Sequence, residues 1–284
     1  MEKYALLDLN TGKFDGGLET LFPGWNGAQE RLCVYSPHDD DAILGAGYAM
    51  RAALDSGAQV HIFIVCSGNA GYSTVEAKDT IVETRKRETL ACYAAFGIPA
   101  ENIVFLDFSD FSALSSLGWQ VAPDREGHFH RTIAELRARK ITRILAPNHY
   151  REHIDHIAAS MMAAYDAPQC GDAMAVDWGE PTPVLSVAEY SVWADLDPED
   201  ALLHKRDPHL RANTVLVAAP EVEECVCNGI RQYASQQEII AGLIEQRQER
   251  RLGDGRYVEV YLRFDPRPKL DFSPYRLAVE RALS

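Results

Sequence analysis

Short apolar runs alternate with longer amphipathic stretches through the first 165 residues of the chain. The apolar runs have the length of buried β-strands and lie at 32–35, 60–66, 102–106 and 143–146. The stretches that follow them have apolar positions spaced as on one face of a helix, at 42–54, 79–96, 129–139 and 154–165. This alternation is typical of parallel βαβ units. It predicts an α/β fold with a Rossmann-like, doubly wound, mostly parallel sheet flanked by helices.

The two ends of the chain are less regular. The opening 30 residues have few periodic apolar positions, and we expect an irregular lead-in. After residue 165 the pattern predicts strands and helices at 184–192, 214–218, 220–237, 238–251 and 257–264. No linker divides the chain. We therefore expect one domain over 1–284, with a core at about 31–165 and with 166–284 supplying substrate-side loops, helices and closing strands.

Composition narrows the classes of function. The formal net charge is −14, which disfavours nucleic-acid binding because phosphates are neutralised by Lys and Arg. No apolar run reaches the roughly 18 residues of a membrane span, and the first residues contain no apolar block typical of a signal peptide. The expectation is a soluble, cytoplasmic protein without a membrane or nucleic-acid partner. A homo-oligomer is compatible with the sequence.

Two His/Asp clusters follow predicted strands. His38-Asp39-Asp40-Asp41 comes after the first strand, and His153-Ile154-Asp155-His156 begins the helix after the fourth. Each cluster alone also fits a solvated turn. In such sheets, however, ligands bind at the carboxyl ends of the strands. Catalytic zinc commonly takes three His or carboxylate ligands, and a carboxylate outside the ligand set then accepts the proton of water. Together the clusters predict a metal-dependent hydrolase.

The same residues resemble the LmbE-like (PIG-L) family of zinc-dependent N-acetyl sugar deacetylases. Its His-Pro-Asp-Asp-Glu signature is similar to the segment 38–42, where Asp39 replaces Pro and Ala42 replaces Glu. Its His-Pro-Asp-His signature is similar to the segment 153–156, with Ile154 for Pro. Weaker similarities lie at 67–71, 85–88, 97, 233–236 and 257–261.

The resemblance implies a role for each residue that matches a motif. It implies one Zn²⁺ per chain held by His38, Asp41 and His156, with other divalent metals as alternatives. Asp40 would be the general base. His153 would be a cationic partner of the oxyanion, and Asp155 would hold a neighbouring histidine.

The resemblance also implies that the substrate is bound by Arg85, Glu88, Gly68 and Asn69. The implied reaction removes an acyl group, which is acetyl by family precedent, from the amine of an N-acetylated sugar or related small molecule. Two other functions stay open: a divalent-metal phosphoester hydrolase, and a non-catalytic carbohydrate-binding relative. The segment 193–213 fits either a lid over the site or a surface loop.

Overall fold

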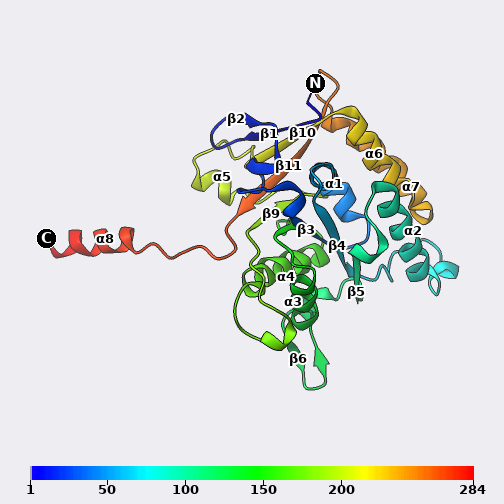
Figure 1. Cartoon of the computed structure of the whole chain (residues 1–284), viewed down its shortest axis with the longest axis horizontal. Helices are drawn as coiled ribbons and strands as arrows, with labels where there is room; N and C mark the ends of the chain where they lie inside the picture. The colour runs from blue at the N-terminus through cyan, green and yellow to red at the C-terminus, as the bar shows by residue number, and fades with distance from the viewer. Residues whose placement is uncertain (1) are drawn as a thin grey trace.

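A mixed sheet of nine strands runs through this computed structural model, which describes residues 2–284 (Figure 1). The strands lie in the order β2 (Lys13–Asp15), β1 (Tyr4–Asp8), β10 (Thr214–Ala218), β11 (Tyr257–Phe264), β9 (Ser186–Tyr190), β8 (Arg143–Pro147), β3 (Arg31–Ser36), β4 (Gln59–Cys66) and β5 (Ile103–Phe108). The mixed α/β class predicted from the sequence is confirmed.

Parallel pairing is confined to one half of this sheet. Strands β9, β8, β3, β4 and β5 are parallel neighbours, whereas β11, β10, β1 and β2 pair antiparallel. The βαβ pattern of the first 165 residues therefore supplies β3, β4, β5 and β8 of the parallel half, and β9 joins them from later in the chain. The irregular lead-in expected before residue 31 was wrong, because β1 and β2 lie there. Only Leu6 of β1 is fully buried, so this sheet edge shows little apolar periodicity.

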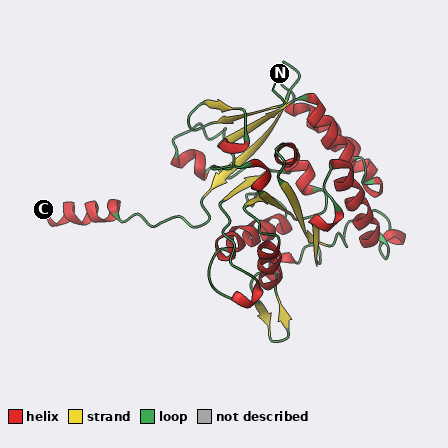
Figure 2. Ribbon diagram, viewed as in Figure 1, coloured by secondary structure: helices red, strands yellow, loops and turns green. Residues whose placement is uncertain are grey.

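Helices cover both faces of the sheet (Figure 2). One face packs against α1 (Asp41–Asp55), α2 (Ile81–Phe96) and α6 (Pro220–Ile230), and the other against α3 (Phe129–Ala138) and α4 (Ile154–Cys170). Strand β3 alternates accordingly: Leu32 and Val34 enter the first core, and Cys33 and Tyr35 enter the second. Gly97 ends α2 in the left-handed conformation (φ +98°), as its position predicted.

The remaining elements lie outside these layers. They are α5 (Glu199–Leu203), α7 (Gln237–Gln246), the small hairpin of β6 (Gln120–Ala122) and β7 (Arg125–Glu126), and α8 (Ser273–Leu283). Helix α8 extends away from the body on a long arm (Figure 1). None of the helices in the described part of the chain is long and apolar enough to span a bilayer.

Close packing of α1 against β9 depends on Gly45. A Cβ atom there would lie 2.5 Å from the Tyr190 ring and 2.6 Å from the Ser191 carbonyl oxygen. We expect Gly45→Ala to lower the free energy of unfolding by about 1–3 kcal/mol, because overpacking forces neighbours to move. Gly242→Ala in α7 is the control, since its Cβ would meet nothing within 4 Å. Urea unfolding of both variants checks this, and equal stability of the two would contradict it.

Candidate metal site and active-site cavity

A cavity of about 560 Å³ opens at the carboxyl ends of the parallel strands. Loops after β3, β4, β5 and β8 form its floor, so segments far apart in sequence meet there. The predicted site residues that line it are His38, Asp40, Asp41, Gly68, Arg85, His153 and His156. The two His/Asp clusters that are far apart in the sequence therefore line the same cavity.

Asp41 lies between two histidines. Its Oδ2 is 3.1 Å from Nδ1 of His38 and 3.1 Å from Nε2 of His156. The three donor atoms of His38, Asp41 and His156 all lie within 4.8 Å of one another. Ligand atoms about 2.0–2.1 Å from a tetrahedral zinc ion lie about 3.3 Å apart. The spacing of this triad therefore fits a single ion.

The buried nitrogens of His156 support the same conclusion. Its side chain is fully buried. Nε2 lies 3.1 Å from Oδ2 of Asp41 and Nδ1 lies 3.2 Å from Oε2 of Glu152, but neither contact with these carboxylates has the geometry of a hydrogen bond. Burial lowers the pKa of His156, but the Asp41 carboxylate outweighs this effect and raises that pKa to about 9. Unpartnered buried polar atoms are rare in native proteins. A cation at this position would supply the missing partner, so the residues present fit a metal.

Asp40 lies beside the triad with a different environment. Burial raises its pKa to about 6, Arg85 opposes this shift, and the carboxylates of Asp39 and Asp41 add to it. Its Oδ2 is 3.4 Å from Nη2 of Arg85. A carboxyl group with a pKa near the working pH is suited to accept and release a proton. The pKa of Asp41 is shifted in the opposite direction. Burial raises it, but His156 and His38 outweigh this effect and lower the pKa of Asp41.

Asp155 connects His38 with His153. Its fully buried carboxylate places Oδ2 3.3 Å from Nε2 of His38 and 3.6 Å from Nδ1 of His153, and Oδ2 accepts a hydrogen bond from the Phe111 N–H at 2.7 Å. Nδ1 of His153 accepts a hydrogen bond from the Asp155 N–H at 3.2 Å. This bond assigns the proton of neutral His153 to Nε2. Burial, followed by the nearby His38, lowers the pKa of His153, with Asp155 opposing.

Asp39, at the position of the family's Pro, has its charge compensated. Its carboxylate accepts hydrogen bonds from Nε of Arg85 at 2.9 Å and from Oγ1 of Thr89 at 2.9 Å. The hydroxyl of Tyr233 donates to its carbonyl oxygen at 2.6 Å. Arg85, predicted to bind substrate, lines the cavity but is itself buried in this ion pair.

Of the other three predicted substrate residues, one lines the cavity and two do not. Gly68 lines the cavity, and its N–H donates to Asp110 at 2.9 Å. Asn69 is exposed and bonds to Ser109 and the Asp110 N–H. Glu88 accepts hydrogen bonds from the backbone and hydroxyl of Ser235, both at 2.7 Å, and does not line the cavity. In the segment 193–213, Trp193 reaches the cavity mouth.

Glu152 is a site residue that the sequence argument missed. Its fully buried side chain places Oε2 3.2 Å from Nδ1 of His156, and its Oε1 accepts hydrogen bonds from the N–H groups of Trp193 and Ala194, both at 3.0 Å. Carboxylates that hold the second nitrogen of a metal-binding histidine fix its orientation and tautomer. The four-residue spacing between Glu152 and His156 was the available signal.

Glu152→Gln should weaken metal binding without removing a ligand. The amide oxygen would keep the bonds to the Trp193 loop, which would turn the NH₂ group toward Nδ1 of His156. The proton would then move to Nε2, the nitrogen that faces Asp41. We expect about a 10–100-fold loss of zinc affinity, measured by competition with a chromophoric chelator. Glu135→Gln, on the surface of α3, is the control, and unchanged affinity in Glu152→Gln would reject this role.

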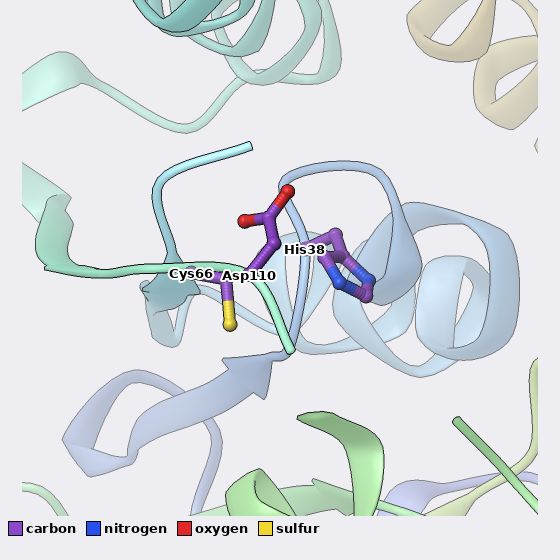
Figure 3. Close-up of side chains that lie close together, drawn as sticks. All are labelled: His38, Cys66 and Asp110. Atoms are coloured by element: carbon purple, nitrogen blue, oxygen red, sulfur yellow. The ribbon is translucent and has the colours of Figure 1, made fainter. Parts of the chain in front are cut away.

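A second group of three donors shares His38 with the triad. His38, Cys66 and Asp110 come from the loops or ends of β3, β4 and β5, and Figure 3 shows the Cys66 sulfur and the Asp110 carboxylate pointing in opposite directions in the view. Asp110 already accepts hydrogen bonds from the N–H groups of Gly68 and Ala70. Burial raises the pKa of the Cys66 thiol, and Asp155 raises it further. The group containing Asp41 and His156 is therefore the better metal site.

Comparison with known families and structures agrees with this geometry. Residues 33–165 match the family model described as PIG-L, GlcNAc-PI de-N-acetylase. This range contains every residue of the triad, together with Asp40, His153 and Asp155. A comparison with curated protein sequences gave no match.

Solved structures with the same fold include both deacetylases and a hydratase. N,N'-diacetylchitobiose deacetylase from Pyrococcus horikoshii is 15% identical with a TM-score of 0.59, covering 84% of each chain. GalB, the 4-carboxy-2-hydroxymuconate hydratase from Pseudomonas putida KT2440, is 16% identical with a TM-score of 0.62, covering 85% of this chain and 99% of that one. The zinc-inhibited form of teicoplanin deacetylase Orf2 is 18% identical with a TM-score of 0.53, covering 83% and 99%. At these identities the likeness concerns the fold.

Proposed function

Because the chain carries a PIG-L family domain in residues 33–165, we propose that it is a metal-dependent N-deacylase. Its substrate would be an N-acetylated sugar or a related small molecule, from whose amine it removes the acetyl group by hydrolysis. The observation that carries this proposal is the convergence of His38, Asp41 and His156 on one point of a cavity that Asp40 also lines.

His38, Asp41 and His156 would hold the metal, with zinc as the first choice because the set contains two imidazoles. Such an ion supplies a Lewis acid that polarises a carbonyl oxygen and lowers the pKa of water. Asp155 and Glu152 would fix the two histidine rings through their other nitrogens. The negative charges of these two carboxylates would also offset part of the positive charge of the ion.

Asp40 would act as the general base. It would take a proton from the attacking water and later deliver it to the leaving amine, since a pKa of about 6 suits both steps. His153 would donate from Nε2–H to the oxygen of the tetrahedral intermediate. The lowered pKa leaves His153 neutral, so it would act as a neutral hydrogen-bond donor to this oxygen, in place of the cationic partner that the family resemblance implies.

The metal-free site should bind zinc more tightly as pH rises. His156 has a pKa of about 9 without metal, so below that pH a bound ion must displace its proton. Burial lowers the pKa of His38, but its contacts with Asp155 and Asp41 outweigh this effect and raise that pKa, so the ion must displace a second proton there. We therefore expect the apparent dissociation constant for zinc to fall by about 100-fold per pH unit between pH 6.5 and 8.5. Chelator competition across this range, with calorimetry in buffers of different ionisation enthalpy to count released protons, measures it. A flat profile would contradict the assignment of His156 as a ligand.

The proposed activity is tested by metal removal and a substrate panel. Chelated protein should release no acetate from N-acetylglucosamine and its derivatives, and stoichiometric zinc should restore release. Phosphate esters and unsaturated hydroxy acids belong in the same panel, because a phosphoester hydrolase and a hydratase are the competing activities. Hydrolysis of a phosphate ester, or water addition without deacetylation, would reject the proposal. Sugar binding by the metal-loaded protein without any turnover would favour the non-catalytic alternative.

A further inference from the structure

Helix α8 carries an apolar stripe that no described part of the chain covers. Every residue of α8 is exposed. Phe272, Tyr275, Val279 and Leu283 follow helical spacing along one side, and their exposed fractions are 63%, 63%, 59% and 83%. Short helices are marginal in water and gain stability mainly by burying such a face. The stripe therefore indicates a binding partner.

The arm that carries α8 directs the helix outward. Residues 265–272 contain Pro266 and Pro268, and Pro274 lies in the first turn of the helix. Prolines and the residues before them favour extended backbone, which makes the arm a semi-rigid spacer. Arg267, between the first two prolines, binds the carboxylate of Asp172 after the end of α4 through two bonds of 2.8 and 3.0 Å. This geometry favours contact with another molecule over folding back.

A groove that matches the stripe lies where the arm leaves the body. This exit groove has a volume of about 520 Å³ and is bounded by α4, α5 and the end of β11. Its apolar lining includes Met161, Tyr165 and Leu203, which are 36%, 62% and 72% exposed. Large apolar side chains grouped in this way on a surface commonly mark an interaction site.

Charge is also complementary between the two surfaces. The exit groove is flanked by the acidic residues Asp197, Glu199, Asp200 and Asp265. Beyond Arg267, which pairs with Asp172, the segment 268–284 contains three Lys or Arg against two Asp or Glu, in a chain whose formal net charge is −14. Such a basic segment is attracted to an acidic rim, and this attraction adds specificity to the apolar contact.

We propose that α8 of one copy binds the exit groove of a second copy, giving a two-fold dimer with exchanged arms. Phe264 and Asp265 belong both to the groove and to the start of the arm, so a two-fold axis beside them lets each arm reach the partner's groove. One helix of 11 residues is only about 16 Å long. Two reciprocal helices double the contact, which brings it toward the area of a stable interface.

The first test compares dimerisation of matched variants by light scattering and sedimentation. The full chain should be a dimer, and the double variant Tyr275→Asp/Val279→Asp should raise the dimer dissociation constant at least about tenfold. Leu277→Asp is the control, because Leu277 is 52% exposed on the other side of the same helix and should leave the constant unchanged. All three positions are exposed, so folding is not at risk. A monomeric full chain at 100 µM, or an equal effect of the control, would overturn the proposal.

The second test identifies the occupant of the groove by cross-linking. A Val279→Cys chain is mixed with a Leu203→Cys chain under mild oxidation, where wild-type protein provides the background because its free cysteines are buried or half-buried. A disulfide-linked dimer that forms only in the mixture supports arm exchange. An intramolecular disulfide in a monomeric Val279→Cys/Leu203→Cys chain would show folding back and overturn the proposal. Binding of α8 to anionic vesicles by a chain that stays monomeric would also overturn it.

Discussion

Asp40→Asn should lower kcat by about 10²–10⁴-fold while zinc stays bound. The amide has nearly the same shape as the carboxylate but cannot accept a proton, so the attacking water loses its base. Asp40 is not among the three residues that would hold the ion, and His38, Asp41 and His156 keep their contacts in the variant. Acetate release measures the loss of kcat, and mass spectrometry of the same sample measures whether zinc stays bound.

Asp107→Asn is the matched control for this experiment. Asp107 is an exposed aspartate on β5 that pairs with Lys86, and its φ of +59° is one that Asn tolerates well. It should retain wild-type kcat. Near-normal turnover in Asp40→Asn would remove the proposed base, whereas zinc loss in that variant would mean that Asp40 belongs to the ligand set.

His156→Ala should abolish both metal binding and activity. The substitution removes one of three ligands and leaves the Asp41 carboxylate beside a buried void, so we expect zinc affinity to fall at least about 100-fold. His130→Ala is the control, since His130 is a half-buried histidine of α3 that pairs with Glu126 outside the cavity. Melting temperatures of both variants separate lost metal from lost fold. Full zinc occupancy in a folded His156→Ala chain would exclude this residue as a ligand.

Much of the parallel half of the fold could be read from the sequence, because its strands are continuous apolar runs. In the antiparallel half, strands β10 and β11 were also predicted with their observed bounds, 214–218 and 257–264. The first two strands were missed because they form a sheet edge on which only Leu6 is fully buried. Helix α8 was missed because its short stripe lies in a segment dense in Pro and charge.

The triad could be proposed from the two motifs, but its supporting residues could not. Asp39 stands at the position of the family's Pro, and only the fold shows that Arg85 and Thr89 compensate its charge from α2. Contacts of this kind join residues about 50 positions apart and leave no local pattern. The role of Glu152 likewise depends on the N–H groups of the loop after β9, which sequence spacing does not reveal.

Anomalous diffraction from zinc-soaked crystals tests the central claim most directly. We expect one strong zinc peak per chain, about 2.0–2.2 Å from a nitrogen of His38, a carboxylate oxygen of Asp41 and Nε2 of His156. A peak held instead by Cys66 and Asp110, or no ordered peak in this cavity at full zinc occupancy in solution, would contradict it.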